Sequence, residues 1–239
     1  MMKALRFLFG WCVLVSVVLG SVRLQAFDRS FYEAYYEKTR LASQIGVSEA
    51  DLTKSMQVML DFVQGKRADL NERIVREGRT VPVYNAKEKA HMVDVRLLYE
   101  RAMIVLGAAV AGMVLTLFGM AWIAKDPKRL LANACAGLLT ASLCFGIVLV
   151  WLGLWIATDF TDFWTRFHTL FFTNDLWLLD PATDFMIVIC PESMFSALVV
   201  AILLRTAFIL LPLELGAWWL LKKKLPIGME NFGDVRTED

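Results

Sequence analysis

The chain has 239 residues, of which 57% are hydrophobic and 21% charged, and its formal net charge is +1. So apolar a composition is unusual for a soluble domain and indicates a membrane protein built as one unit. A charge this close to neutral leaves no basic stripe that could neutralise phosphates, which excludes a nucleic-acid partner.

The four cysteines do not form a pattern that carries chemistry. Cys12, Cys135 and Cys144 fall inside apolar segments and only Cys190 falls outside one. There is no CxxC spacing, so we expect neither a disulfide framework nor a cysteine metal site. We interpret the cysteines as packing residues.

Four segments are long and apolar enough to cross a bilayer, which takes ~20 helical residues. They lie within residues 1–26, within residues 102–157, which hold two spans separated by a short turn, and within residues 195–221. The first segment could also be a secretory signal, because Lys3 and Arg6 precede its apolar run. Both readings place residue 27 and the segment after it outside the cytoplasm.

Basic residues predict the orientation of these spans. Three basic groups lie at one end of the spans: Lys3 and Arg6; Lys125, Lys128 and Arg129; and Lys222, Lys223 and Lys224. The positive-inside rule places all of them in the cytoplasm, with both termini and a tail of residues 222–239. The protein is then expected in the cell membrane, with residues 27–101 and 158–194 on the extracytoplasmic side.

The first outer region has its own secondary-structure signals. Ser48 to Asp51 forms a capping box before an amphipathic run, and residues 74–83 predict a hairpin with Glu77 and Gly78 at its turn. Asn85 and Glu88 cap a helix that runs through His91 into the second span. The expected fold is therefore mainly α, a four-transmembrane-helix bundle with a small extracytoplasmic α+β cap.

The only two histidines, His91 and His168, both fall on the outer side. On a helix, Asp94 lies on the same face as His91 at i,i+3, where a carboxylate could orient the imidazole. An imidazole held in this way is suited to act as a general base.

His168 lies among aromatic residues at helical spacing, namely Phe160, Phe163, Trp164, Phe167 and Phe171. We expect the third span to continue as a helix through them, which would hold His168 at the depth of lipid ester groups. Trp177, Asp180 and Asp184 come next, in what we predict to be a structured acidic loop.

Plainer readings of the same residues stay open. Interfacial aromatic residues are often only anchors, and a single exposed histidine often has no function. A metal site built from the two histidines with Asp94 or Asp184 lacks the local spacing of known metal motifs, so we expect no metal. We expect no cofactor of another kind.

Two arginines stand out near the spans. Arg205 lies near the middle of the last span, where a charge is costly without a partner, and Glu214 is on the opposite side of that helix. One interpretation is that Arg205 faces a polar cavity inside the bundle, where it could bind substrate; the other is a purely structural role. Arg23 could bind polar groups of a substrate, but snorkelling to the interface is the favoured reading.

Two runs, EKAHMVDVRLLYERA around His91 and FHTLFFTNDLWLLDPATDFMIVICPESMF around His168, resemble one known family. Together with the four-span layout they are similar to the lipoprotein intramolecular transacylases, integral membrane enzymes of low-GC Gram-positive bacteria. The resemblance covers nearly the whole chain. Residues 186–190 are more apolar than this family suggests, and Met194 interrupts an aromatic pair before Phe195.

The resemblance implies an acyltransferase whose substrate is a diacylglyceryl-modified lipoprotein in the membrane. Such enzymes move the sn-2 acyl chain of the glycerol to the α-amino group of the N-terminal cysteine, which gives a lyso-form lipoprotein. The essential pair would be His91 and His168, with the acidic loop at Asp180 and Asp184. We expect a monomer that meets only its substrate and membrane lipids.

Our mechanistic hypothesis makes His91 the general base, oriented by Asp94, while His168 assists by hydrogen bonding or as the acid. His91 lies ~16 Å along a straight helix from Ala102, so we expect that helix to bend or break, or the outer domain to bring His91 down. The alternative function is that of a non-catalytic membrane receptor or assembly factor. A metal-dependent hydrolase is a third reading.

Overall fold

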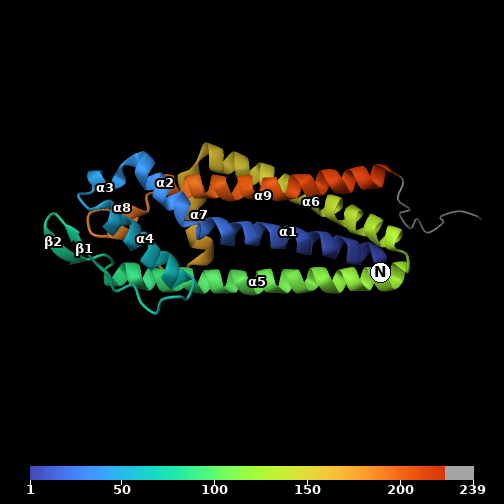
Figure 1. The fold of residues 1–239 in the computed structure, drawn as a ribbon, viewed down its shortest axis with the longest axis horizontal. Helices are drawn as coiled ribbons and strands as arrows, with labels where there is room; N and C mark the ends of the chain where they lie inside the picture. The colour runs from blue at the N-terminus through green and yellow to red at the C-terminus, as the bar shows by residue number, and fades with distance from the viewer. Residues whose placement is uncertain (224–239) are drawn as a thin grey trace, which may run out of the picture. The chain divides into compact units, whose positions relative to one another are not determined.

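A computed structural model describes residues 1–223, in which helices account for most of the chain (Figure 1). Lys224 and the rest of the expected tail lie outside the described residues. The elements follow in the order α1 Met2–Ala26, α2 Arg29–Thr39, α3 Leu41–Gln44, α4 Glu49–Val63, β1 Arg73–Arg76, β2 Arg79–Pro82, α5 Ala86–Ala124, α6 Pro127–Thr158, α7 Phe160–Phe171, α8 Phe185–Ile189 and α9 Glu192–Lys222.

Four of these helices, α1, α5, α6 and α9, are long and apolar enough to cross a membrane. The first sixteen residues of α5 include seven charged ones, so its membrane-spanning part begins only after Arg101. Large apolar side chains are exposed on these helices, among them Phe118 on α5 and Ile147 on α6, as a lipid surrounding requires. The predicted mainly α membrane fold with four spans and a small sheet is confirmed.

The chain divides into two units. The first holds Met1–Val18, Leu106–Val150 and the described part of Thr206–Asp239; the second holds Leu19–Val105 and Trp151–Arg205. We call them the first unit and the second unit and describe each by itself.

In the first unit, α1 and α6 approach so closely that glycine is needed at the contact. A Cβ atom on Gly137 would overlap the backbone of Arg6, and one on Gly10 would overlap the backbone of Gly137. Small residues let transmembrane helices come together in this way. A buried apolar cluster that includes Leu14, Leu138 and members of α9 completes this packing.

The second unit has a core of its own, formed by α2, α4, the hairpin, the start of α5 and the segment around α8. Two tyrosines connect distant parts of this core by hydrogen bonds to main-chain carbonyls. The Tyr84 hydroxyl donates to the carbonyl of Ser55 at 2.7 Å, and the Tyr36 hydroxyl donates to the carbonyl of Ile189 at 3.0 Å. The buried hydroxyls thus satisfy their hydrogen bonds while the rings supply apolar area.

Two local elements between α1 and α5 form as the sequence predicts. The hydroxyl of Ser48 accepts from the backbone N–H of Asp51 at 3.0 Å and starts α4. Strands β1 and β2 pair antiparallel, and the two turn residues, Glu77 and Gly78, have φ of 50° and 74°. Two consecutive positive φ values are typical of the turn that suits a two-residue hairpin.

The start of α5 is capped from both sides. The Asn85 side chain accepts from the backbone N–H of Glu88 at 3.0 Å, and the Glu88 carboxylate accepts from the backbone N–H of Asn85 at 2.6 Å. This confirms the predicted capping box. Helix α5 then continues without interruption to Ala124, so it contains no break below His91.

One prediction about the third span is wrong. Helix α6 ends at Thr158, and Asp159, with φ −153° and ψ 88°, lies outside any helix. Its carboxylate accepts from the backbone N–H of Asp162 at 2.9 Å and so caps a new helix, α7. His168 is therefore carried by a separate helix of 12 residues and not by a continuation of the span.

Candidate active site

His91 lies in the second turn of α5 with only 6% of its surface exposed. Among the described residues its Nδ1 atom has no hydrogen-bond partner. The ring meets Phe172 edge-on at 5.2 Å between centroids. Burial lowers the pKa of His91 to about 4, the neighbouring His168 acts in the same direction, and Asp94 opposes the change. His91 is therefore neutral near pH 7.

His168 lies in the last turn of α7 and is 7% exposed. Its Nδ1 atom is 2.7 Å from the carbonyl oxygen of Trp164, which can only accept. Nδ1 therefore carries the proton, and Nε2 of the neutral ring is left as an acceptor. Burial lowers the pKa of His168, and the hydrogen bond to Trp164 opposes that effect.

The two imidazoles lie together, although 77 positions of sequence separate them. Their ring centroids are 6.1 Å apart, and the rings are tilted by 33°. Aromatic side chains surround the pair: Phe172 lies next to both rings, and the indole of Trp177 stacks on His168 at 4.9 Å. The two histidines that the resemblance names as a pair therefore lie side by side in the second unit.

The acidic residues of the expected site do not contact the histidines through hydrogen bonds. Asp94 accepts instead from the side chain of Asn174 at 2.9 Å. The partly exposed carboxylate bonds to this residue of the loop between α7 and α8, so the i,i+3 spacing alone does not pair Asp94 with His91. Asp180 is exposed and accepts from the backbone N–H of Ala182 at 2.9 Å.

Asp184 is buried, at 3% exposed, and shapes the loop. Its carboxylate accepts from the side chains of Asn85 at 2.7 Å and Lys87 at 3.3 Å, and from the backbone N–H of Asp180 at 2.8 Å. The backbone hydrogen bond from Asp180 is the main cause that lowers the pKa of Asp184. The ionised carboxylate therefore holds the loop to the start of α5.

Glu88 plays a wider part than the capping role predicted from the sequence. Its side chain is only 1% exposed, and besides capping α5 it accepts a hydrogen bond from the backbone N–H of Met186. Burial raises the pKa of Glu88 above its usual range. The capping-box spacing identified the bond to Asn85, but no sequence signal pairs Glu88 with a residue 98 positions further on.

Arg205 finds its partners on α1 and at the start of α2. Its Nε and Nη2 atoms donate to the Gln25 side chain at 3.0 and 2.9 Å, and Asp28 lies 3.7 Å away. Gln25 was missed from the sequence because only partners along the same helix were considered. Arg23 is exposed, and its side chain forms no hydrogen bond or ion pair with the described residues.

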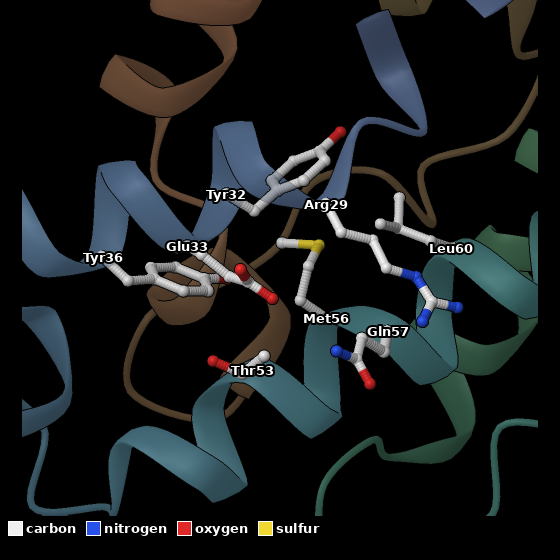
Figure 2. Close-up of a pocket in the computed structure, with 8 residues that line it drawn as sticks. All are labelled: Arg29, Tyr32, Glu33, Tyr36, Thr53, Met56, Gln57 and Leu60. Carbon is white, nitrogen blue, oxygen red and sulfur yellow. The ribbon is translucent and has the colours of Figure 1, made fainter. Parts of the chain in front are cut away.

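A small hollow in the second unit opens between α2 and α4 (Figure 2). Arg29, which is bonded to Asp61 at 3.0 and 3.1 Å, lies at one side of it, and Met56 lies near its centre. None of the expected site residues lines this hollow. Across residues 1–223, no three His, Cys, Asp or Glu side chains gather into a group that could hold a metal.

Comparison with solved structures finds the same fold in a membrane-integral lipoprotein intramolecular transacylase, Lit, from Bacillus cereus. The match has a TM-score of 0.74 at 19% identity and covers 94% of this chain and 97% of that chain. Two further structures of that protein, in which a histidine is replaced by arginine or by alanine, match with a TM-score of 0.70 at 18% identity. These two matches cover 93% and 95% of the Bacillus cereus chains, respectively, and each covers 94% of this chain.

No curated protein sequence matches the chain at a significant level. The family model described as "Lipoprotein intramolecular transacylase Lit" matches residues 7–195, which is well over half of the chain. The chain therefore belongs to the lipoprotein intramolecular transacylase family, Lit, and is an acyltransferase.

Proposed function

We propose that this protein moves the sn-2 acyl chain of a diacylglyceryl-modified lipoprotein to the α-amino group of its N-terminal cysteine. The product is a lyso-form lipoprotein. The observation that carries the proposal is the pair of buried, neutral imidazoles whose centroids lie 6.1 Å apart. An attack of an amine on an ester requires one group that accepts a proton and another that stabilises the oxyanion.

The tautomer of His168 favours it as the proton acceptor. Its Nδ1–H is held by the Trp164 carbonyl, so Nε2 can take the proton of the attacking amine and return it to the glycerol oxygen that leaves. His91, without a partner at Nδ1, is neutral and can donate an N–H to the oxyanion. This assignment exchanges the roles that were expected from the sequence, because Asp94 bonds to Asn174.

The reaction involves no oxidation or reduction. The α-amino nitrogen forms a bond to the acyl carbon, the bond from that carbon to the sn-2 oxygen breaks, and the amine proton passes to that oxygen. Because the amine and the ester belong to one molecule, holding them ~3 Å apart supplies a large effective molarity. Two imidazoles in an aromatic surrounding can then suffice.

We propose that residues 27–101 and 158–194 face away from the cytoplasm, so that the histidines meet the substrate at the outer leaflet. The basic residues of the turn between α5 and α6, Lys125, Lys128 and Arg129, support this orientation. Aromatic residues of α7 would anchor the site at the depth of the lipid headgroups.

The test uses purified protein in lipid vesicles and a synthetic diacylglyceryl lipopeptide with a free N-terminal amine. The transfer leaves the mass of the lipopeptide unchanged, so tandem mass spectrometry must locate the acyl chain on the N-terminal cysteine. Amine-directed labelling of the lipopeptide should fall in parallel. Isotope-labelled phospholipid in the vesicles should contribute no acyl chain to the product.

Replacing either histidine should reduce the rate by ~100-fold or more, because each supplies proton transfer or charge stabilisation in the transition state. His91→Ala and His168→Ala should be compared with Glu100→Gln, a change on an exposed part of α5. Near-normal conversion by either histidine variant would contradict the proposed roles. If the unaltered protein only binds the lipopeptide, the receptor reading replaces the enzymatic one.

A further inference from the structure

The outer loop between α7 and α8 is held to the start of α5 by a group of hydrogen bonds. The Asn85 side chain donates to the Asp184 carboxylate at 2.7 Å and to the Thr183 carbonyl at 3.4 Å. Further along α5, the Asn174 side chain donates to Asp94 at 2.9 Å. These bonds join residues that are 80 to 99 positions apart in sequence.

Lys87 bonds to the same loop at two points. Its Nζ atom donates to the carbonyl of Leu178 and lies 3.3 Å from the Asp184 carboxylate. Leu178 directly follows Trp177, and the Trp177 indole stacks on His168 at 4.9 Å. The bond from Lys87 therefore fixes the main chain next to the ring that covers His168.

Glu88 forms the buried part of the group. One carboxylate oxygen caps α5 through the backbone N–H of Asn85, and the other accepts from the backbone N–H of Met186 at the start of α8. The side chain is 1% exposed and lies one helical turn before His91. A single carboxylate thus sets both the position of the helix that carries His91 and the end of the loop that carries Trp177.

We infer that Glu88 and Lys87 are positioning residues for acyl transfer, which align His91 on α5 with His168 and the Trp177 ring. This inference rests on the proposed function. Neither residue needs to touch the substrate. The physical basis is that a misplacement of about 1 Å in a reacting geometry can cost ~100-fold in rate.

The first experiment replaces Lys87 by Met and uses Lys89→Met as the matched control. Lys89 lies on the same helix, but its Nζ atom bonds to Asn71 at 2.7 Å instead of the loop. Lys87→Met should lower kcat ~10-fold with KM changed by less than ~3-fold, because only alignment is lost. Lys89→Met should leave both values near those of the unaltered protein.

A second measurement reports the alignment without turnover. The chain has only two histidines, so carbethoxylation by diethylpyrocarbonate, mapped by peptide mass spectrometry on protein without a histidine tag, reports the modification of His91 and of His168 separately. Both side chains are less than a tenth exposed. Loss of the Lys87 bond should uncover His168 and speed its modification several-fold, whereas Lys89→Met should not.

Glu88→Gln tests the buried half of the group, with Glu100→Gln as the matched control. An amide can accept only through its oxygen, so one of the two backbone N–H groups loses its acceptor. We expect a fall in kcat of between ~10-fold and ~100-fold per folded molecule. If this variant does not fold, the Lys87→Met result decides alone.

Unchanged kcat and unchanged histidine modification in Lys87→Met would overturn the inference, as would a Glu88→Gln protein that is less stable but fully active when folded. These outcomes leave the proposed function standing, because the unaltered protein would still convert the lipopeptide. If the unaltered protein converts none, the proposed function itself fails.

Discussion

Different interactions stabilise the interior of each of the two units. In the first unit, helices α1 and α6 meet backbone to backbone at Gly10 and Gly137, and the rest of the contact is apolar. In the second unit, buried polar groups bond across long separations in sequence: Glu88 and Tyr84 bond to main-chain atoms, and Asp184 bonds to the side chain of Asn85. The first unit therefore depends on shape, and the second depends on directed hydrogen bonds that also place the two histidines.

This difference has a reason in the surroundings of each unit. Within a membrane, the lipid is as apolar as the helices, so close packing of small residues supplies much of the association energy. In the second unit, each buried carboxylate has to replace the water it loses with donors from the protein. The proposed chemistry, which needs two aligned imidazoles, thus lies in the unit that directed hydrogen bonds stabilise.

The largest effect on stability is expected from a substitution at the glycine contact of the first unit. Gly137→Ala places a Cβ atom onto the backbone of Arg6, which cannot move aside as a side chain can, and should cost ~3 kcal/mol or more. Gly146→Ala on the same helix is the control, because nothing lies within 4 Å of its Cβ position. Thermal unfolding in detergent measures both, and equal midpoints would show that the close contact contributes nothing.

A pH titration should affect the second unit through His91. Its folded pKa is about 4 and its usual value is 6.5, so between these values the unfolded chain binds a proton that the folded chain does not. Stability should therefore fall as pH drops below 6.5 and level off below about 4, with a total loss of ~3 kcal/mol. Unfolding midpoints of the unaltered protein and His91→Phe, measured across this range, test the sign.

If His91→Phe shows the same slope as the unaltered protein, the pH dependence comes from other groups. His168, whose pKa is lowered in the same direction, adds to the effect, so His168→Phe should remove a further part of the slope.

The smallest of the three effects concerns Arg205. Arg205→Leu leaves Gln25, which is buried, without its donor, and should cost ~1 kcal/mol of stability. Arg23→Leu, which removes an exposed arginine without a partner among the described residues, should cost less. A double variant that also carries Gln25→Leu should recover part of the loss, and strictly additive effects would show that the pair is not coupled.

Sequence reasoning could predict features that depend on nearby residues. The four spans follow from runs of apolar residues, and the caps at Ser48 and Asn85 follow from a spacing of three. The hairpin follows from Glu77 and Gly78 at its turn. Each of these signals lies within a few residues of the structure that it specifies.

Features that depend on distant residues could not be predicted in the same way. Asp159 reads equally as part of a helical run or as a cap, and only the structure shows that it ends α6 and starts α7. The spacing in sequence pairs Asp94 with His91, but the Asp94 carboxylate accepts a hydrogen bond from Asn174, which is 80 positions from Asp94. The meeting of His91 and His168 followed from the topology and the family resemblance, whereas the bonds of Glu88 to Met186 and of Arg205 to Gln25 gave no sequence signal.

The hairpin of the second unit has a consequence for crowded membranes. Its strands are only four residues long, and Arg73, Arg76 and Arg79 are exposed along them, with the guanidinium of Arg76 5.1 Å above the ring of Phe185. Short edge strands that carry like charges resist pairing with a β-strand of a neighbouring molecule. The exposed hairpin should therefore resist pairing with a strand of a second molecule.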